Sequence, residues 1–388
     1  MIRVLLVSPL DPKKPGNLKF LVGGENTYTR TLLANPAKGV VYMHHLEALK
    51  KGHIEYLPLQ KNLALLVRAR VLPLSSGTQC FLIKKHFDLI HCHGYSLKIE
   101  GKSLPVILSD SSSNYLFLRD YVNWPEWRIR IGYLLRRWLF GLLGVVDADT
   151  NPNGAKKIIV FSKFAHKLHK DLGVPKEKLE VIYAGLPHSY SSSEGAYATE
   201  SRSKKESSRQ ARTINILFVG TWFERKGGAL LIEAFKILSE KYSNIRLTIV
   251  GQVPKNFKVQ NKKLKVYDFV PRERLMREFF PRADIFVLAP PKVEGFGFSV
   301  LEAISFGIPV VVSNVCALPE LVENGKTGFV VKPGSINDLV EKLEILIKDQ
   351  TLREKMGDAT RKRFLEKFSI EKSNSGLLKI YNNALKSS

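Results

Sequence analysis

The sequence predicts an α/β protein made of two doubly wound domains in tandem. Three observations support this fold class: a length of 388 residues, short apolar runs that alternate with helix-length segments, and a serine-rich stretch between two such series. A chain of this length exceeds one ordinary core and suggests two domains of roughly 150–200 residues each. Strands that alternate with helices form a parallel sheet covered on both faces.

The first domain is predicted to cover residues 1–187. Its opening strand, Ile2–Ser8, is followed by Gly23-Gly24 and a helix. Many nucleotide-binding units begin in this way, but the spacing lacks the full dinucleotide fingerprint, and a plain loop-to-helix turn explains it equally well. Further strands are expected at Ile54–Leu59, Asp88–His93, Val106–Ser109, Lys157–Phe161 and Glu180–Tyr183.

A change of composition marks the end of the first domain. Residues 188–212 are rich in serine and lysine and poor in apolar side chains, as flexible linkers are. The second domain then covers residues 213–369, and a helical tail at about 370–388 is expected to pack back on the first. Its strands are expected at Ile214–Val219, Arg246–Val250, Lys265–Val270, Asp284–Ala289, Pro309–Ser313 and Gly328–Val331. Ligands of such sheets bind beyond the carboxyl ends of the strands, so we expect the site in the cleft between the domains.

The net charge and the cysteines restrict the partners and the compartment. A formal charge of +24 indicates an anionic partner: nucleic acid, a phosphorylated substrate or acidic lipid headgroups. The three cysteines are scattered and odd in number, which argues against a disulfide framework and fits a reducing cytoplasm. With no signal peptide and no run of about 20 apolar residues, a cytoplasmic protein is expected.

The stretch Pro290–Ala303 carries the most specific chemistry. Glu294 and Glu302 flank a Gly-Phe-Gly turn at the start of a predicted helix, after an apolar strand. Helix N-terminal amides, with glycines that admit a ligand, bind anions such as a diphosphate, and the glutamates suit sugar hydroxyls. The carboxylates of a glycoside hydrolase lie about 5–9.5 Å apart, whereas eight residues of helix span roughly 12 Å. A sugar nucleotide is therefore the predicted ligand, with a loop glutamate and a cap glutamate as the structural alternative.

Further segments accompany this stretch in a fixed order. They are Phe218–Gly227, Leu247–Gly251, Ala283–Leu288, Gly307–Val311 and Gly325–Val331. Together they resemble the retaining glycosyltransferases of family 4, which have the GT-B fold, two Rossmann-like domains that face each other across a cleft. The resemblance covers nearly all of the chain and implies transfer of a hexose-type sugar from a UDP- or GDP-sugar to a glycan or lipid-linked acceptor.

The resemblance also implies roles for individual residues. Glu294 would contact the hydroxyls of the donor sugar, Glu302 the ribose, and Lys226 with Arg225 the departing diphosphate. Thr221 stands where many members have arginine, so Arg225 is expected to supply that charge. The implied catalytic residues are His93, at the end of a strand, Arg225, Lys226 and Glu294. The implied donor-binding residues are Gly23, Gly24, Gly220, Gly295, Phe296, Gly297, Phe298, Ser299 and Glu302.

The resemblance implies a front-face transfer in which the leaving phosphate accepts the proton of the acceptor. Cations and a helix N-terminus aimed at that phosphate would stabilise the transition state. Neither a cofactor nor a metal is expected. His91 and His93 lack further convergent ligands, and Asp147-Ala148-Asp149, which resembles a metal-binding carboxylate pair, is interpreted as a loop.

The segment Trp124–Leu143 interleaves aromatic residues with four arginines. It is interpreted either as a core helix whose arginines reach solvent, or as a peripheral helix on the inner face of the cell membrane with arginines at lipid phosphates. Two alternative functions also remain: a GT-B sugar-nucleotide epimerase or glycan phosphorylase, and a nucleic-acid-binding protein. Only the charge supports the last, since no nucleic-acid module is recognised.

Overall fold

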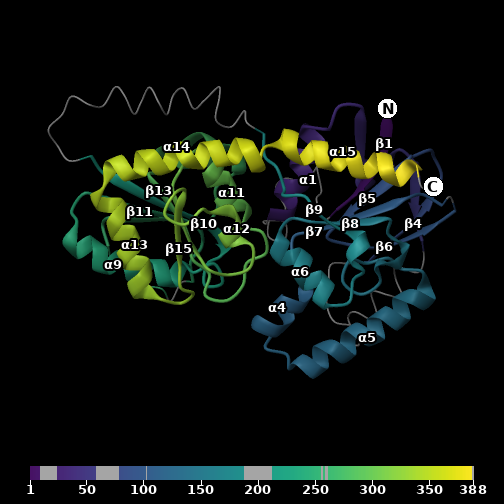
Figure 1. Cartoon of the computed structure of the whole chain (residues 1–388), viewed down its shortest axis with the longest axis horizontal. Coiled ribbons are helices and arrows are strands. Elements are labelled where there is room, and N and C mark those ends of the chain that lie inside the picture. Colours follow the sequence, from purple (N-terminus) through teal and green to yellow (C-terminus); the bar gives the residue numbers. More distant parts are fainter. Residues whose placement is uncertain are drawn as a thin grey trace. The chain divides into compact units, whose positions relative to one another are not determined.

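The computed structural model describes residues 1–8, 24–57, 78–101, 103–187, 212–254, 257 and 261–386. Its contacts divide the chain into two units (Figure 1). One unit combines Met1–Gly185 with Ile370–Ser388, and the other is Leu186–Ser369. The predicted linker at 188–212 lies outside the described residues except for its last residue.

The first unit is built on a parallel sheet whose described strands follow the order β2-β1-β5-β7-β8-β9. The central strands are buried on both faces because helices cover them, which explains their continuous apolar sequences. A smaller sheet, β3-β4-β6, shares the same core. The strands are β1 (Ile2–Val7), β2 (Val40–His44), β3 (Ile54–Tyr56), β4 (Thr78–Ile83), β5 (Leu89–His93), β6 (Ser96–Glu100), β7 (Val106–Asp110), β8 (Lys157–Val160) and β9 (Leu179–Val181).

Helices of this unit begin at recognisable caps. The Ser113 hydroxyl accepts a hydrogen bond from Tyr115 N at the start of α4, and the Ser162 hydroxyl accepts one from Ala165 N at the start of α6. The C-terminal helix α15 belongs to this unit, and its Asn374 side chain donates to the Asn35 carbonyl. The helices are α1 (Gly24–Ala34), α2 (His45–Lys50), α4 (Asn114–Asp120), α5 (Glu126–Leu143), α6 (Lys163–Asp171) and α15 (Ile370–Lys386), with 3-10 turns at Pro152–Gly154 and Lys176–Lys178.

The second unit has a parallel sheet in the order β12-β11-β10-β13-β14-β15. Numbered along the unit this is 3-2-1-4-5-6, the Rossmann order, and the direction of winding changes between β10 and β13. Ligands of such sheets bind at this change of direction, beyond the carboxyl ends of the two strands. The strands are β10 (Ile214–Trp222), β11 (Ile245–Gln252), β12 (Leu264–Tyr267), β13 (Ile285–Leu288), β14 (Val310–Ser313) and β15 (Gly328–Val331).

The central strands β10, β13 and β14 of this second sheet are likewise apolar and largely buried, whereas the edge strand β12 is mostly exposed. The predicted α/β class with doubly wound parallel sheets is thus confirmed in both units. The helices are α9 (Gly228–Lys241), α10 (Arg272–Arg274), α11 (Phe298–Ser305), α12 (Leu318–Leu321), α13 (Ile336–Lys348) and α14 (Gln350–Lys367), with a π-helical turn at Leu275–Phe279 and a 3-10 turn at Phe280–Arg282.

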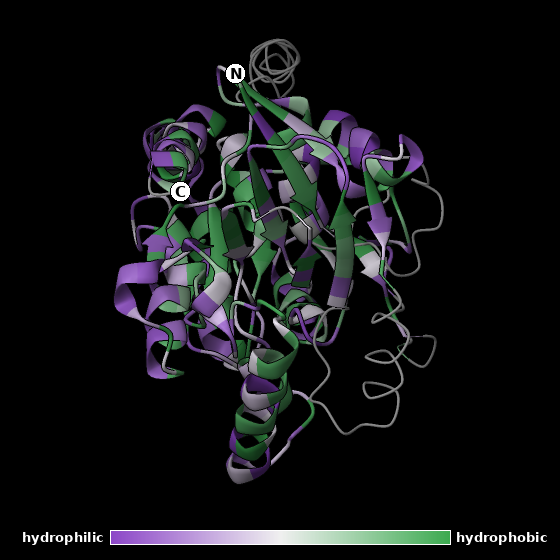
Figure 2. Cartoon of the chain, turned by 90° about the vertical axis from the view of Figure 1, so that its right-hand side faces the viewer, coloured by the Kyte–Doolittle hydropathy of each residue, from purple (hydrophilic) through white to green (hydrophobic). Residues whose placement is uncertain are grey.

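Helix α5 exposes apolar side chains along one face. In Figure 2, where hydrophobic residues are green, it is the helix at the bottom and much of its surface is green. The exposed side chains recur at helical spacing and are Trp127, Ile131, Leu134, Leu135, Trp138 and Leu142. Within the described residues, no helix is long and apolar enough to cross a membrane.

The arginines of α5 do not all reach the solvent, which corrects one part of the membrane interpretation. Arg136 lies on the buried face, where its Nη2 donates to Asp147 Oδ2 at 2.6 Å and to Ser96 Oγ at 2.8 Å. A guanidinium committed to a buried carboxylate cannot also contact lipid phosphate. Arg137 donates to the carbonyls of Thr150 and Leu172, so it too anchors the helix to its own unit.

Candidate active site

The second unit brings three of the predicted catalytic side chains together where its sheet changes direction. Arg225 and Lys226 lie in the turn after β10, and Glu294 lies in the loop after β13, the neighbouring strand. Lys226 Nζ is 3.1 Å from each oxygen of Glu294, and Arg225 Nη1 is 3.6 Å from Glu294 Oε2. The arrangement is the one expected for a site beyond the carboxyl ends of parallel strands.

Charge, not burial, decides the ionisation of Glu294. The carboxylate is buried, and burial raises its pKa, but Lys226 and then Arg225 more than offset this and leave the pKa below its ordinary value. Glu294 is therefore an anion at neutral pH that accepts hydrogen bonds from Lys226 and lies in an ion pair with Arg225. A carboxylate in this state can hold sugar hydroxyls, and the two cations beside it can interact with phosphate.

Two glycines allow the turn after β10 to form. The extended Lys226 side chain passes over Gly220, where a Cβ would lie 2.5 Å from Lys226 Cδ. Gly227 has φ +82°, and a Cβ there would lie 1.9 Å from the Ala289 carbonyl oxygen at the end of β13. The predicted donor-binding residue Gly220 thus leaves space for the Lys226 side chain. Gly227, which was not among the predicted site residues, allows the ends of β10 and β13 to approach each other.

Helix α11 begins at Gly297, which has φ +86° and precedes Phe298. A Cβ at Gly297 would lie 2.5 Å from Leu318 Cδ2, so only glycine fits this N-terminus without a shift. Ser299, in the first turn, has a buried hydroxyl without a hydrogen-bond partner among the described residues. The predicted diphosphate-binding stretch is therefore a helix N-terminus with a buried donor, the arrangement that binds anions.

Aromatic packing fixes the same helix start. The rings of Phe296 and Phe298 meet edge to face with centroids 5.4 Å apart, and both side chains are buried. Gly295 lies between Glu294 and this aromatic pair. The two phenylalanines predicted to bind donor are thus placed to support the turn, while the neighbouring backbone and Ser299 are the groups able to meet a ligand.

Glu302 has a partner that the sequence did not reveal. Its carboxylate pairs with Arg272 Nη1, and Arg272 precedes the π-helical turn before β13. Both side chains are largely buried. The two glutamates of the motif are therefore each held by a cation of the second unit, and they face different partners, as expected for two carboxylates that contact different parts of one ligand.

In the first unit, His93 ends β5 at the carboxyl edge of the sheet. Its Nδ1 lies 3.1 Å from the Ser109 carbonyl oxygen, which only accepts, and 3.0 Å from the Ser109 hydroxyl, so we assign the tautomer in which Nδ1 donates to the carbonyl. Burial lowers the pKa of His93 to about 4, so the ring is neutral at pH 7 and Nε2 carries a lone pair. This nitrogen is buried and has no hydrogen-bond partner in the described part of the chain. His93 is therefore an available acceptor for a substrate hydroxyl.

Side chains from distant parts of the first unit surround His93. The Tyr28 ring, on α1, lies 4.8 Å from the His93 ring, and Phe161 lies 5.5 Å away. His91, two residues earlier, bonds the Tyr381 hydroxyl of α15 at 2.6 Å through Nδ1, and burial lowers its pKa to about 3. These contacts position the strand end, and no local sequence pattern predicts them.

The remaining predicted residues of the first unit are Gly23 and Gly24. Gly24 is the first residue of α1, whereas Gly23 lies outside the described residues. Their predicted contact with the donor diphosphate therefore stays a prediction.

A family model supports the second unit's sequence pattern. Residues 199–363 match the family described as glycosyl transferases group 1. The capsular polysaccharide biosynthesis glycosyltransferase CapM of Staphylococcus aureus is 33% identical over 177 residues, which cover 44% of this chain and 46% of CapM. An uncharacterised glycosyltransferase of Methanocaldococcus jannaschii is 29% identical over 304 residues, 76% of this chain and 75% of that protein. The chain thus spans about half the length of CapM and three quarters of the archaeal relative.

Solved structures establish the fold of the whole chain. The HepE protein of Anabaena, in complex with UDP and glucose, superposes with a TM-score of 0.66 at 14% identity and covers 99% of this chain and 100% of its own. A sucrose-phosphate synthase from Thermosynechococcus elongatus gives a TM-score of 0.67 at 17% identity over 100% of both chains. The predicted GT-B fold, with two Rossmann-like domains, is confirmed.

Proposed function

We propose that this protein is a retaining glycosyltransferase that takes a hexose-type sugar from a nucleoside diphosphate. The observation that carries the proposal is the contact of Lys226 and Arg225 with Glu294 at the switch point between β10 and β13. A sugar nucleotide joins a hydroxyl-rich ring to a dianionic diphosphate, and this site offers a carboxylate beside two cations. The match to glycosyl transferases group 1 supports the same activity.

In the proposed reaction, the bond between the anomeric carbon and the leaving phosphate oxygen breaks. The acceptor oxygen forms the new bond on the same face of the sugar, and its proton passes to the leaving phosphate. Lys226, Arg225 and the N-terminus of α11 stabilise the negative charge that grows on the diphosphate. Glu294 holds the sugar hydroxyls, and Glu302, oriented by Arg272, holds the ribose.

Uridine is the favoured base and a glycan the favoured acceptor, with a GDP-sugar and a lipid-linked acceptor as the alternatives. The related fold of Anabaena was solved with UDP and glucose, and the TarM of Staphylococcus aureus was solved with UDP and an α-GlcNAc-glycerol. CapM is named for capsular polysaccharide biosynthesis. Because these proteins share only the fold or half of their length with this chain, they support the choice of probes for the experiments below.

We also propose that α5 contacts an anionic membrane surface. Six large apolar side chains on one face, two of them tryptophans more than half exposed, match a helix that lies in the headgroup region. Arg128, stacked on Trp124 at 4.3 Å, and Arg130, which pairs with the exposed Glu126, lie on the exposed part of the helix, and the chain as a whole carries +24. Peripheral binding would bring the enzyme to a lipid-linked acceptor.

A thermal-shift screen of UDP, GDP and their hexose derivatives tests the donor assignment. A ligand that binds only the native state raises the melting temperature. At a concentration one hundred times its dissociation constant, it adds about 2.7 kcal/mol to the free energy of unfolding. In the variant Glu294→Ala, UDP and UDP-sugars should raise the melting temperature by the same amount, because the side chain that would hold the sugar hydroxyls is gone. If no nucleotide stabilises the folded protein, the donor proposal is wrong, and turnover with inorganic phosphate as the sole co-substrate would replace it with a glycan phosphorylase.

A further inference from the structure

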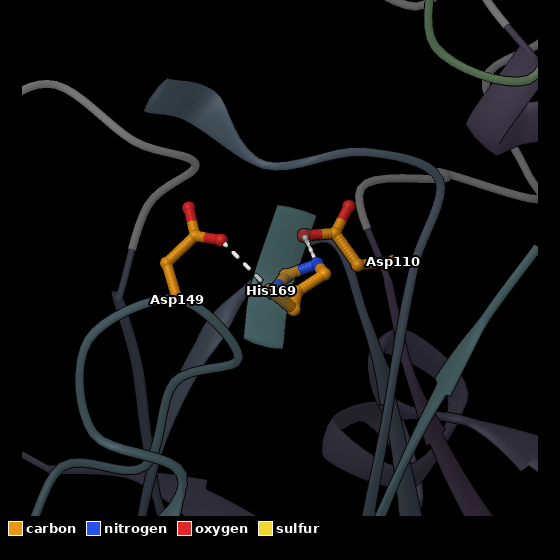
Figure 3. A group of neighbouring side chains, drawn as sticks. All are labelled: Asp110, Asp149 and His169. Carbon is orange, nitrogen blue, oxygen red and sulfur yellow. Dashed lines mark ion pairs between the residues drawn. The ribbon is translucent and has the colours of Figure 1, made fainter. Parts of the chain in front are cut away.

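A second group of ionisable side chains lies in the first unit and takes no part in the proposed donor site. It consists of Asp110, Asp149 and His169 (Figure 3). Asp110 is the last residue of β7, Asp149 lies in the loop before β8, and His169 is on α6. One ligand atom from each residue can be chosen so that the three atoms lie within 4.8 Å of one another. Three separate elements thus converge on one point.

The imidazole of His169 lies between the two carboxylates without a hydrogen bond to either. Its Nε2 is 3.8 Å from Asp110 Oδ2, and its Nδ1 is 3.5 Å from Asp149 Oδ1. The ring is fully buried, and both of its nitrogens and Asp149 Oδ1 lack a hydrogen-bond partner among the described residues. Buried polar atoms without partners destabilise a fold, so an occupant that satisfies them would stabilise this one.

Each carboxylate is anchored through one oxygen and turns the other toward the imidazole. Asp149 Oδ2 accepts hydrogen bonds from Asn114 N and the Tyr133 hydroxyl, both at 3.1 Å, which leaves Oδ1 facing His169. Asp110 Oδ1 accepts from Ser112 N at 3.2 Å, and Oδ2 faces the ring. Metal sites use such outer hydrogen bonds to orient their ligands.

The Arg136 guanidinium forms its buried ion pair with a different carboxylate. Arg136 is committed to the adjacent carboxylate Asp147, which also accepts from Ser96 and Thr150. Asp147 is therefore a satisfied structural carboxylate, while Asp149, two residues later, faces the imidazole. The two aspartates of the Asp147–Asp149 segment, both interpreted from sequence as loop residues, have different surroundings.

We propose that Asp110, Asp149 and His169 form a binding site for a divalent cation of the zinc or manganese class. Two carboxylate oxygens and one imidazole nitrogen suit these ions, whereas magnesium and calcium prefer oxygen alone. Two ionised carboxylates would balance the charge of the ion. Tetrahedral ligands at about 2.1 Å from a zinc ion lie about 3.4 Å apart. The two carboxylates contact different nitrogens of His169, so side chains must rotate until one ring nitrogen and both carboxylates, which offer ligand atoms within 4.8 Å of one another, meet the same ion.

The site adjoins the carboxyl edge of the first sheet, where His93 lies. Asp110 follows Ser109, whose backbone carbonyl orients His93, and Ser109 pairs with His93 in the register of β5 and β7. Three protein ligands leave coordination positions for water or for a substrate oxygen. An ion here would hold β7, α6 and the loop before β8 in place beside His93.

Calorimetric titration of chelator-treated, dialysed protein with zinc chloride and manganese chloride tests the site directly. We expect one ion per chain, and a melting temperature that rises with zinc and falls again with chelator. The variants Asp149→Asn and His169→Gln should lose this binding. His166→Gln, which changes a histidine on the same helix outside the group, should retain it and so controls for adventitious binding by surface histidines.

Binding of neither ion by the wild type, or wild-type affinity in both site variants, would overturn the proposal. If the variants fail to fold, the ligand shell of the zinc-loaded wild type decides the question. X-ray absorption should show one imidazole nitrogen together with oxygen ligands. A shell of oxygen alone, or one of several imidazoles, would contradict the site. None of these measurements depends on the donor or on transfer activity.

Discussion

Lys226 Nζ lies 3.1 Å from both carboxylate oxygens of Glu294, so one ammonium bridges the whole carboxylate. This contact places a positive charge beside a buried anion. When a diphosphate arrives, Lys226 can share its three protons between Glu294 and phosphate, because an ammonium donates in several directions. Substitution of Lys226 should therefore affect both the buried carboxylate and the charge that grows on the diphosphate.

Replacement of Lys226 by methionine should reduce transfer strongly and also lower the stability of the fold, because it leaves the buried Glu294 carboxylate without the closer of its two cations. Methionine keeps the length of the chain over Gly220 but removes the charge that stabilises the leaving diphosphate. Loss of one such group typically costs about 10²–10³ in kcat. The measurement is the rate of nucleoside diphosphate release at saturating donor. Lys236→Met, which removes an exposed lysine paired with Glu233 on α9, is the matched control and should leave the rate unchanged. Equal rates in the two variants would remove Lys226 from the mechanism.

Much of the fold follows from local sequence, because buried parallel strands have continuous apolar runs. The central strands of both sheets were predicted within a few residues for this reason. Strands β2, β4 and β6 were not predicted, since polar residues such as His44, Gln79 and Lys98 interrupt their apolar runs. These strands gain their stability from neighbours distant in the sequence, which a local pattern does not record.

The candidate site also has a part that the sequence predicts and a part that only the structure shows. Glu294, Lys226 and the glycine turn belong to short segments whose order is recognisable. Arg272, which pairs with Glu302, is 30 residues away along the chain, and no spacing rule connects them. The partners of His93 and His91 come from α1, β7 and α15, so only the tertiary structure shows that His93 Nε2 is left as an acceptor.

The histidine pair makes the stability of the protein depend on pH. The pKa of His93 falls to about 4 and that of His91 to about 3, in each case mainly because of burial, against an ordinary value near 6.5. The unfolded chain therefore binds more protons than the native protein between the lowered pKa values of the two histidines and their ordinary value near 6.5. Stability is fully present above pH 6.5 and is lost as the pH falls toward 4, by up to about 3 kcal/mol for His93 alone.

Urea unfolding at pH 7.0 and at pH 4.5 measures this dependence. The variant His93→Gln should show a smaller decrease between the two values than the wild type. His53→Gln, a half-buried histidine that lies outside this pair, should keep the wild-type decrease. A decrease of the same size in His93→Gln and the wild type would show that the His93 ring is protonated in the native state.

Gly227→Ala should be more harmful than the same change at Gly325. Both glycines have left-handed backbones, with φ of +82° and +78°, so alanine pays about 1–2 kcal/mol of strain at each. A methyl group at Gly325 meets nothing within 4 Å, whereas one at Gly227 would lie 1.9 Å from the Ala289 carbonyl oxygen. Chemical denaturation should give a loss of more than about 3 kcal/mol for Gly227→Ala, with a displaced Lys226 and lower turnover. If both variants lost the same free energy of unfolding, the turn after β10 would have to move away from the end of β13 without cost, which would contradict the predicted clash.

The exposed stripe of α5 should determine membrane binding. The double variant Leu134→Ser, Trp138→Ser removes two apolar anchors that are each about two-thirds exposed, and each anchor contributes about 1.5–3 kcal/mol when it leaves water. Co-sedimentation with vesicles of phosphatidylglycerol and phosphatidylcholine should therefore fall by more than tenfold. Ile237→Ser, on α9 of the second unit, changes an exposed apolar residue outside α5 and should bind as the wild type does.

The lipid composition and the oligomeric state complete this test. Binding by the wild type should weaken in pure phosphatidylcholine and in high salt, because the basic residues near α5 contribute through screened charge. Size-exclusion chromatography tests the alternative that a second copy of the chain, and not a membrane, covers the exposed apolar face of α5. A wild-type dimer that the double variant converts to a monomer, together with unchanged vesicle binding, would assign the face to a second copy of the chain and reject the membrane.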